Sequence, residues 1–319
     1  MGDGGGVNST WPWGIAVVTG SMNRSVMNRR SLLKAAVLGP MVFSSAGGAL
    51  AALAKDDRFR SAIGLQLYTL RNEIGKDAAG TMKAVAEAGY RQVEPYRSPQ
   101  TEVMIKAAKE NGMAVNSMHF DWNTVVAPKD EAMSDFQKVV EEAKGHGLTH
   151  LVIPYLDASQ RGGLDAYKVI AERANKAAVL AKKAGIQLAY HNHSFEFEPL
   201  AGGKTGFDVL VSEFAPEMKF EVDVFWVKAG GVEPLDLMRR LKGRVSQLHL
   251  KDLKSGLALP IFANMPADGF KELGNGVIPM EPIIKLAAEI GVDHCHVEQD
   301  QSPDPLGSVR QSLKHLATL

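Results

Sequence analysis

A repeated unit constrains the fold of this 319-residue chain more than any other feature. Five times, a charged or polar helical stretch ends at a glycine and is followed at once by a short apolar segment. Glycine just after a helix supplies the left-handed conformation that ends it, and the chain then enters a strand. Helices and strands that alternate in this way predict βαβ units and a parallel sheet. The five units are AEAGYRQVEPY (Gly89), KENGMAVNSMHF (Gly112), KGHGLTHLVIPY (Gly147), KKAGIQLAYHNH (Gly185) and AEIGVDHCHVEQ (Gly291).

Three further strands are predicted at Ile63–Tyr68, Lys219–Val224 and Val245–Leu250, which brings the total to eight. Eight strands favour an α/β fold of the (β/α)8 TIM-barrel type in a single domain, for which about 250 residues are typical. An open, doubly wound sheet is the alternative. No Gly-x-Gly-x-x-Gly follows the first strand and no Walker sequence is present, so a nucleotide-binding fold lacks its usual signature.

The first 54 residues are predicted to lie outside this barrel. Residues 1–26 are rich in glycine, and we interpret them as an extension or an artefact of the assigned start. Residues 27–54 look like a twin-arginine export signal, with Arg29-Arg30, a moderately apolar run and an Ala52-Leu53-Ala54 end. A membrane anchor or a surface helix is the alternative for this segment. We therefore expect residues 55–319 to form the barrel, to work in the periplasm and to have no stable membrane insertion after the signal is removed.

The charge and cysteine counts limit the possible partners and cofactors. Lysine plus arginine number 36 and aspartate plus glutamate also number 36, so the formal net charge is zero. Nucleic acid is therefore not an expected partner, since proteins that bind it normally carry a basic excess. The single cysteine, Cys295, excludes a cysteine-cluster metal site. Metal chemistry in this chain must use histidines and carboxylates.

Several polar side chains fall at or just after the predicted strand ends. In a parallel barrel all these ends lie at one rim, which is where active sites of this fold form. Imidazoles and carboxylates that converge there suit Mn²⁺, Mg²⁺, Co²⁺ or Zn²⁺. We predict a divalent-metal site, and a purely structural polar rim is the alternative. The residues concerned are Glu94, His119, Tyr155, His191, His193, Asp223, His249 and Glu298.

At these positions the chain resembles a known family. GIQLAYHNHSFEFEPL, FEVDVFWVKAGG, SQLHLKDL, ELGNGVIP and HVEQD are similar to segments of the xylose isomerase-like TIM-barrel family of sugar isomerases and epimerases. IGLQLYTLRNE and TMKAVAEAGYRQVE resemble that family's first strand, helix and second strand. The likeness runs from about Ile63 to Leu316, with the segments in family order.

The resemblance implies a metal held by glutamate, aspartate, histidine and glutamate from strands five to eight. Asp223, His249 and Glu298 match the last three positions. The first position departs from the pattern. The candidates for it are His191, His193 and Glu196. His191 is the one that keeps the strand register. Mn²⁺ is the metal that we expect first.

The chemistry expected of such a site is proton abstraction next to a metal-bound carbonyl, which leaves an enediolate. His193 and Glu298 are the candidate bases. Lys251 is a candidate donor to a substrate oxygen, with an ion pair to a rim carboxylate such as Glu298 as the alternative. The candidate substrate contacts are Glu94, His119, Trp226 and Glu196, and Tyr68 and Phe120 are candidates for an apolar wall beside Trp226.

These features predict a metal-dependent isomerase or epimerase acting on a sugar or keto-sugar. No glycine-rich phosphate cradle is visible, which favours a non-phosphorylated substrate. A lyase or dehydratase acting on a 3-keto-glycoside or an inosose, and a non-catalytic sugar-binding barrel, are the alternatives. A nuclease like endonuclease IV is disfavoured, because Trp226 stands where that enzyme needs a histidine. The resemblance is compatible with a homo-oligomer, although no segment marks an interface.

Overall fold

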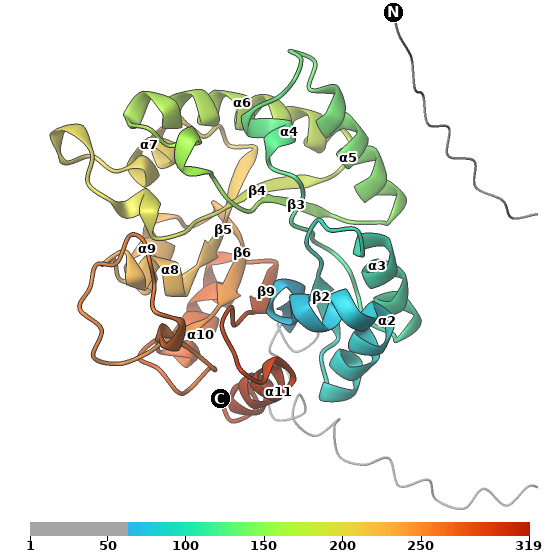
Figure 1. The fold of residues 1–319 in the computed structure, drawn as a ribbon. Helices are drawn as coiled ribbons and strands as arrows, with labels where there is room; N and C mark the ends of the chain where they lie inside the picture. The colour runs from blue at the N-terminus through green and yellow to red at the C-terminus, as the bar shows by residue number, and fades with distance from the viewer. Residues whose placement is uncertain (1–62) are drawn as a thin grey trace, which may run out of the picture. The chain divides into compact units, whose positions relative to one another are not determined.

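The computed structural model of the chain describes residues 63–319, drawn in colour in Figure 1. The predicted extension at residues 1–26, the predicted export signal at residues 27–54 and the expected mature start near Lys55 lie outside the described residues. Within residues 63–319, no helix is long and apolar enough to cross a membrane.

Seven parallel strands form the main sheet, in the order β2-β1-β9-β6-β5-β4-β3. A two-stranded antiparallel pair, β7 with β8, follows β6 outside that sheet. The strands are β1 (Ile63–Gln66), β2 (Gln92–Glu94), β3 (His150–Ile153), β4 (Gln187–His191), β5 (Met218–Asp223), β6 (Val245–Leu250), β7 (Asp252–Leu253), β8 (Phe270–Lys271) and β9 (His294–Val297).

Residues 114–119 occupy the gap between β2 and β3, so the sheet closes on itself. Isolated parallel bridges join this segment to both neighbours, through Ala114 on one side and His119 on both sides. The segment was predicted as a strand, but its ladder is irregular because the carbonyl of Asn116 accepts N–H groups from both Thr149 and His150, each at 2.9 Å. Because that segment takes the eighth strand position, the predicted (β/α)8 barrel and the single domain are confirmed.

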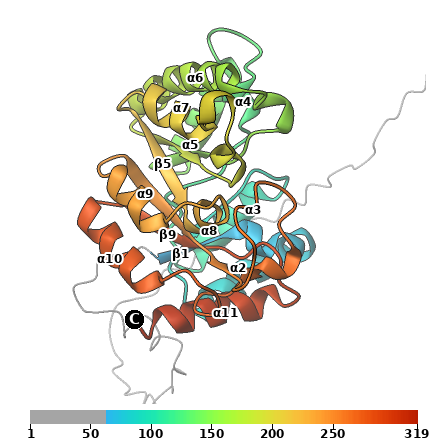
Figure 2. The same ribbon diagram turned by 90° about the vertical axis from the view of Figure 1, so that its left-hand side faces the viewer.

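The helices end and pack as the repeated units require. All five predicted glycines have positive φ, between 73° and 113°, which is the left-handed conformation that a side chain would disfavour. Figures 1 and 2 show the last helix, α11, beside the first, α2, so the helical layer also closes. The helices are α2 (Arg71–Ala88), α3 (Thr101–Glu110), α4 (Asn123–Val126), α5 (Ser134–Gly145), α6 (Leu164–Lys183), α7 (Gly206–Glu213), α8 (Val224–Ala229), α9 (Pro234–Arg240), α10 (Met280–Ile290) and α11 (Pro305–Leu316), with 3-10 turns η1 (Leu67–Leu70), η2 (Ala158–Gln160), η3 (Phe195–Phe197), η4 (Ala201–Gly203) and η5 (Ala267–Gly269).

The inward face of the barrel is unusually polar. Alternate residues of a strand face opposite sides, so on β5 Phe220 packs outward against Phe207 and Phe214 while Glu221 and Asp223 face the interior. Barrels of this type normally fill the interior with branched apolar side chains. Here the buried interior carries carboxylates and imidazoles, and this places the candidate site.

Candidate metal centre and active site

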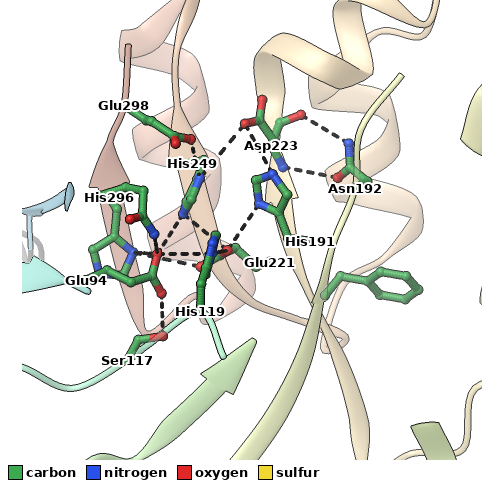
Figure 3. Close-up of polar contacts among 12 residues, drawn as sticks. Glu94, Ser117, His119, His191, Asn192, Glu221, Asp223, His249, His296 and Glu298 are labelled. Atoms are coloured by element: carbon green, nitrogen blue, oxygen red, sulfur yellow. Dashed lines mark hydrogen bonds and ion pairs between the residues drawn. The ribbon is translucent and has the colours of Figure 1, made fainter. Parts of the chain in front are cut away.

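Asp223, His249 and Glu298 meet at the carboxyl ends of β5, β6 and β9. The His249 Nδ1 atom lies 2.9 Å from Glu298 Oε2 and 3.9 Å from Asp223 Oδ2. One possible ligand atom from each of the three residues lies within 4.8 Å of the other two. Figure 3 shows them arriving from separate strands. The parallel strands therefore bring together the three positions that the family pattern selected.

Local structure fixes the orientation of Asp223. Its Oδ1 atom accepts the backbone N–H of Trp226 at 2.9 Å, so Asp223 is the N-cap of α8. The Asn192 side chain accepts the backbone N–H of Asp223 at 3.1 Å, which ties the end of β4 to the end of β5 (Figure 3). The remaining oxygen, Oδ2, is buried and accepts no well-aligned hydrogen bond.

His249 is held between carboxylates at both ring nitrogens. Its Nε2 atom lies 2.8 Å from Glu94 Oε2 and 3.2 Å from Glu221 Oε2, on the side away from Glu298. Burial alone would lower the pKa of His249, but the negative charges of Glu221 and Glu298 raise it well above its usual range. Carboxylates behind a metal-binding imidazole fix its tautomer and its ring orientation. Glu94 and Glu221 are placed to do this for His249.

Lys251 lies among three carboxylates at the same rim. Its Nζ atom is 2.7 Å from Glu298 Oε2, 3.1 Å from Asp223 Oδ2 and 3.0 Å from Asp300 Oδ2. The ion pair with Glu298, which was the alternative role for Lys251, is thus present. Burial disfavours the charged amine, yet the neighbouring Asp223, Asp300 and Glu298 raise the pKa of Lys251 well above its ordinary value.

Replacing Lys251 by methionine should make the stability of the protein depend on a divalent metal. Methionine keeps the length of the side chain but leaves two buried carboxylates and the partly buried Asp300 without their cation. We expect the metal-free variant to lose about 3–5 kcal/mol of unfolding free energy, and to regain most of it with Mn²⁺. Urea unfolding with and without Mn²⁺ measures this.

The matched control is Lys182→Met, because Lys182 pairs with Glu217 at 3.2 Å while its side chain is 70% exposed. An exposed pair of this kind contributes at most about 1 kcal/mol. An equal loss with and without Mn²⁺ in Lys251→Met would contradict metal binding beside Lys251.

His191, the last residue of β4, and His193, two residues later, differ in their surroundings. The His191 Nδ1 atom lies 3.2 Å from Glu221 Oε2, and its Nε2 atom lies 3.8 Å from Asp223 Oδ2. His193 stacks on Phe195, and its Nδ1 atom is buried with no hydrogen-bond partner. Burial, followed by the charges of His191 and Lys251, lowers the pKa of His193 well below its ordinary value. His193 is therefore a neutral imidazole near pH 7.

Glu196 does not reach the rim. One of its oxygens accepts the hydroxyl of Tyr190 at 2.7 Å and the other accepts the backbone N–H of His193 at 2.8 Å. Of the three choices for the first ligand position, His191 is the one whose ring lies beside Asp223. The place of Glu196 also differs from that of a substrate contact, because its buried carboxylate holds the backbone of His193 instead.

The burial of Glu196 should make protein stability fall as pH rises. Burial raises its pKa from an ordinary value of 4.5 to about 7. Between these values the folded state binds more protons than the unfolded state, so stability is full below about pH 4.5 and declines up to about pH 7. The decline is on the order of 3 kcal/mol.

Glu196→Gln should remove this slope while it keeps one acceptor for Tyr190 or His193. We expect the variant to be less stable than the wild type at pH 5 and to match or exceed it at pH 8. Denaturant unfolding at both pH values measures the difference. A difference that does not change with pH would show that the carboxyl does not titrate in this window.

A cavity of about 540 Å³ opens beside the cluster of Asp223, His249 and Glu298. His191, His193, Lys251, Glu298 and Asp300 line one part of it. Aromatic side chains line much of the rest, namely Tyr68, Tyr96, Phe120, Trp122 and Tyr155. The candidate bases and the candidate donor thus face one space that can hold a small molecule.

The predicted substrate contacts divide into two groups. His119 lines the cavity, where its Nε2 atom lies 2.7 Å from Glu221 Oε2. Glu94 lies below the cavity, fully buried, and accepts a hydrogen bond from Gln66 at 2.8 Å. Trp226 packs behind the cavity wall, with its ring 5.1 Å from that of His193 and 5.5 Å from Lys251 Nζ. The structure therefore brings His119, but neither Glu94 nor Trp226, to the cavity surface.

Sequence reasoning missed Glu221, His296 and Asp300. Glu221 and His296 precede Asp223 and Glu298 by two residues, and Asp300 follows Glu298 by two. The two-residue period of a strand could have found the first two, since it puts them on the inward face. Burial, then the charge of Glu298, raises the pKa of Asp300 to about 7, while Lys251 opposes the shift.

The donor set fits a divalent cation. Asp223, His249 and Glu298 offer nitrogen and oxygen ligands, and catalytic metal sites commonly use three protein ligands with an open position. The buried Asp223 Oδ2 atom pairs with Lys251 Nζ at 3.1 Å but accepts no well-aligned hydrogen bond, so it can serve as a ligand. These residues, with His191 beside them, would hold the ion.

Comparison with known proteins now identifies the family. The model of the family described as "Xylose isomerase-like TIM barrel" matches residues 82–319. The chain belongs to this family. An inosose dehydratase from Clostridium botulinum is 22% identical over 256 residues, which cover 72% of this chain and 84% of the relative.

Solved structures support the fold of this family member. A sugar phosphate isomerase/epimerase from Parabacteroides distasonis superposes with a TM-score of 0.65 at 24% identity, covering 81% of this chain and 94% of that one. A D-psicose 3-epimerase from Clostridium cellulolyticum, in complex with D-tagatose, gives a TM-score of 0.57 at 13% identity over 81% and 98% of the two chains. The named relatives are isomerases, epimerases and dehydratases.

Proposed function

We propose that the protein is a divalent-metal-dependent enzyme that removes a proton next to the carbonyl of a non-phosphorylated sugar or keto-sugar. One observation carries the proposal. The ring of His193, whose buried Nδ1 atom has no hydrogen-bond partner, lines the same cavity as the candidate metal ligands Glu298 and His191. Proton removal next to a carbonyl requires such a pairing of a base and an electrophile.

The proposed reaction needs metal ligands, a base and a hydrogen-bond donor, and different residues supply them. When bound by Asp223, His249 and Glu298, a divalent cation supplies a Lewis acid that polarises a substrate carbonyl. His193 accepts the proton from the adjacent carbon, because its ring lines the cavity and is neutral near pH 7. Lys251 donates to a substrate oxygen, since its ammonium already lies at the cavity wall.

The charges around the cavity favour a neutral substrate. Among the described residues that line it, the lysine and arginine side chains are Lys251 and Arg97. Lys251 contacts three carboxylates, and Arg97 pairs with Glu142 at 3.2 Å. Carboxylates therefore balance both positive charges, so the lining has no excess positive charge to attract a phosphate group.

Isomerisation or epimerisation is the leading reaction, and a dehydration is the second candidate. The match to inosose dehydratases over most of their length favours the second. Both begin with the same proton transfer. They differ in whether the proton returns to carbon or an oxygen is expelled from the neighbouring carbon.

Solvent exchange tests the shared step. The metal-loaded protein is incubated in D2O with a panel of keto-hexoses, 3-keto-glucosides and an inosose, and the products are followed by NMR. We expect deuterium at the carbon next to the carbonyl of at least one compound. A new epimer or isomer identifies the first reaction, and a conjugated enone, or the 1,2-diketone to which it tautomerises, identifies the second. A panel with neither exchange nor either kind of product, despite bound metal, would refute the proposal.

A further inference from the structure

The cavity is divided between two contiguous halves of the barrel. In the sheet order, β4, β5, β6 and β9 are neighbours, and the ends of β4, β6 and β9 supply His191, His193, Lys251, Glu298 and Asp300. The loops after β1, β2, the segment 114–119 and β3 make up the rest of the rim. They supply Tyr68, Tyr96, Phe120, Trp122 and Tyr155. The division is therefore one of topology, with a reactive half and an aromatic half.

The aromatic half is arranged as two edge-to-face pairs. The rings of Tyr68 and Tyr96 are 5.5 Å apart at 86°, and those of Trp122 and Tyr155 are 5.7 Å apart at 78°. Tyr155 also meets His193 edge-to-face at 5.1 Å, which joins this half to the reactive half. Edge-to-face packing leaves ring faces available to a further flat group.

Tyr68 is held in place although it is exposed. The residue is 43% exposed, while the guanidinium of Arg71 lies 4.4 Å from its ring centre. Arg71 is itself fixed by hydrogen bonds to the carbonyls of Tyr68 and Asp300, at 3.0 and 2.8 Å. Tyr68 therefore has a fixed position in the cavity lining, where its ring can contact a ligand.

The cavity is larger than one sugar ring. A hexose has about 12 non-hydrogen atoms, and even at the roughly 30 Å³ that a water molecule takes in the liquid it would fill only about 360 Å³. The cavity of about 540 Å³ leaves at least about 180 Å³, and the aromatic half borders the reactive half. The polar exceptions in the aromatic half are His119 and the exposed Arg97 and Asp121.

We infer that the substrate is a sugar carrying a flat aromatic substituent, with the sugar ring in the reactive half and the substituent stacked in the aromatic half. This inference rests on the proposed function, because that function places the sugar beside His193 and Glu298. It goes further by assigning the chemical class of the whole substrate, an aryl glycoside or its keto form. Trp122 and Tyr68 are the substituent's main contacts.

Binding without turnover tests the inference. The metal-loaded full chain is titrated by calorimetry with phenyl β-D-glucopyranoside, methyl β-D-glucopyranoside and cellobiose. We expect the phenyl compound to bind at least about tenfold more tightly than the methyl compound and than cellobiose, since stacking on aromatic side chains contributes effects of this size. Equal affinities, no measurable binding of the phenyl compound, or a preference for cellobiose would each overturn it.

Variants locate the contact. Trp122→Ala should weaken phenyl glucoside binding about tenfold and leave methyl glucoside binding unchanged. Tyr68→Ala, at an exposed position that does not threaten folding, should act in the same direction. Phe262→Ala is the control, because Phe262 packs against the core away from the cavity lining. Equal behaviour of all three variants would overturn the inference. Because no step needs turnover, a failure of the proposed function appears separately, in the exchange assay.

Discussion

Asp223→Asn should abolish stable metal binding and leave the fold intact. The asparagine side chain can still accept the N–H of Trp226 and cap α8, because that bond uses the Oδ1 position. What it loses is the negative charge at Oδ2, the buried oxygen that lacks a well-aligned hydrogen bond. We expect metal affinity to fall at least about 100-fold, since even residues behind the ligands cost about 10–100-fold. Turnover should fall with it.

The structure offers a closely matched control for this variant. Asp304 is also an N-cap, and its Oδ1 atom accepts the N–H of Gly307 at 3.0 Å, but it lies exposed at the start of α11. Asp304→Asn should leave metal content unchanged. Elemental analysis after chelator-free purification, together with Mn²⁺ titration, measures both variants. A metal content in Asp223→Asn equal to that of the control would remove Asp223 from the ligand set.

The fold could be predicted because its signals are local. Each glycine cap marks the end of one helix, and each apolar run after it marks a strand, so the βαβ order needs no long-range information. The segment 114–119 was harder. Its apolar pattern predicts a strand, but the double acceptance by the Asn116 carbonyl, which breaks the ladder, depends on a neighbour that is over 30 residues away.

The candidate site was predictable only where strand ends determine position. Asp223 and His249 end or nearly end strands, so the parallel sheet brings them together whatever the loops do. Glu196 and Trp226 lie several residues beyond the strand ends, in η3 and α8, where the two-residue period of the strand no longer fixes the direction of the side chain. In the structure the Glu196 carboxylate accepts the hydroxyl of Tyr190, and the Trp226 ring lies 5.5 Å from Lys251 Nζ. Glu221 lies two residues before Asp223 on β5, on the same inward face but below the rim. It could be found only by following the two-residue period of the strand back from the rim.

His193→Asn should separate proton transfer from metal binding. His193 lines the cavity, whereas the rim group of Asp223, His249 and Glu298 assembles without it. Asparagine is polar and of similar size but cannot accept a proton at neutral pH. We expect solvent exchange to slow by about 10²–10⁴-fold, the usual contribution of a general base, while metal content stays at the wild-type level.

The control for this variant is His294→Asn. His294 is another histidine whose pKa is lowered, in this case to about 4 by burial, but it begins β9 at the opposite end of the barrel from the rim. Its replacement should leave the rate of deuterium incorporation unchanged. If His193→Asn loses metal and His191→Asn loses only exchange, the two histidines have the reverse roles. The geometry argues against that reversal, because His191 has ring nitrogens near Asp223 and Glu221, whereas His193 belongs to none of the clusters of possible metal ligands found among residues 63–319.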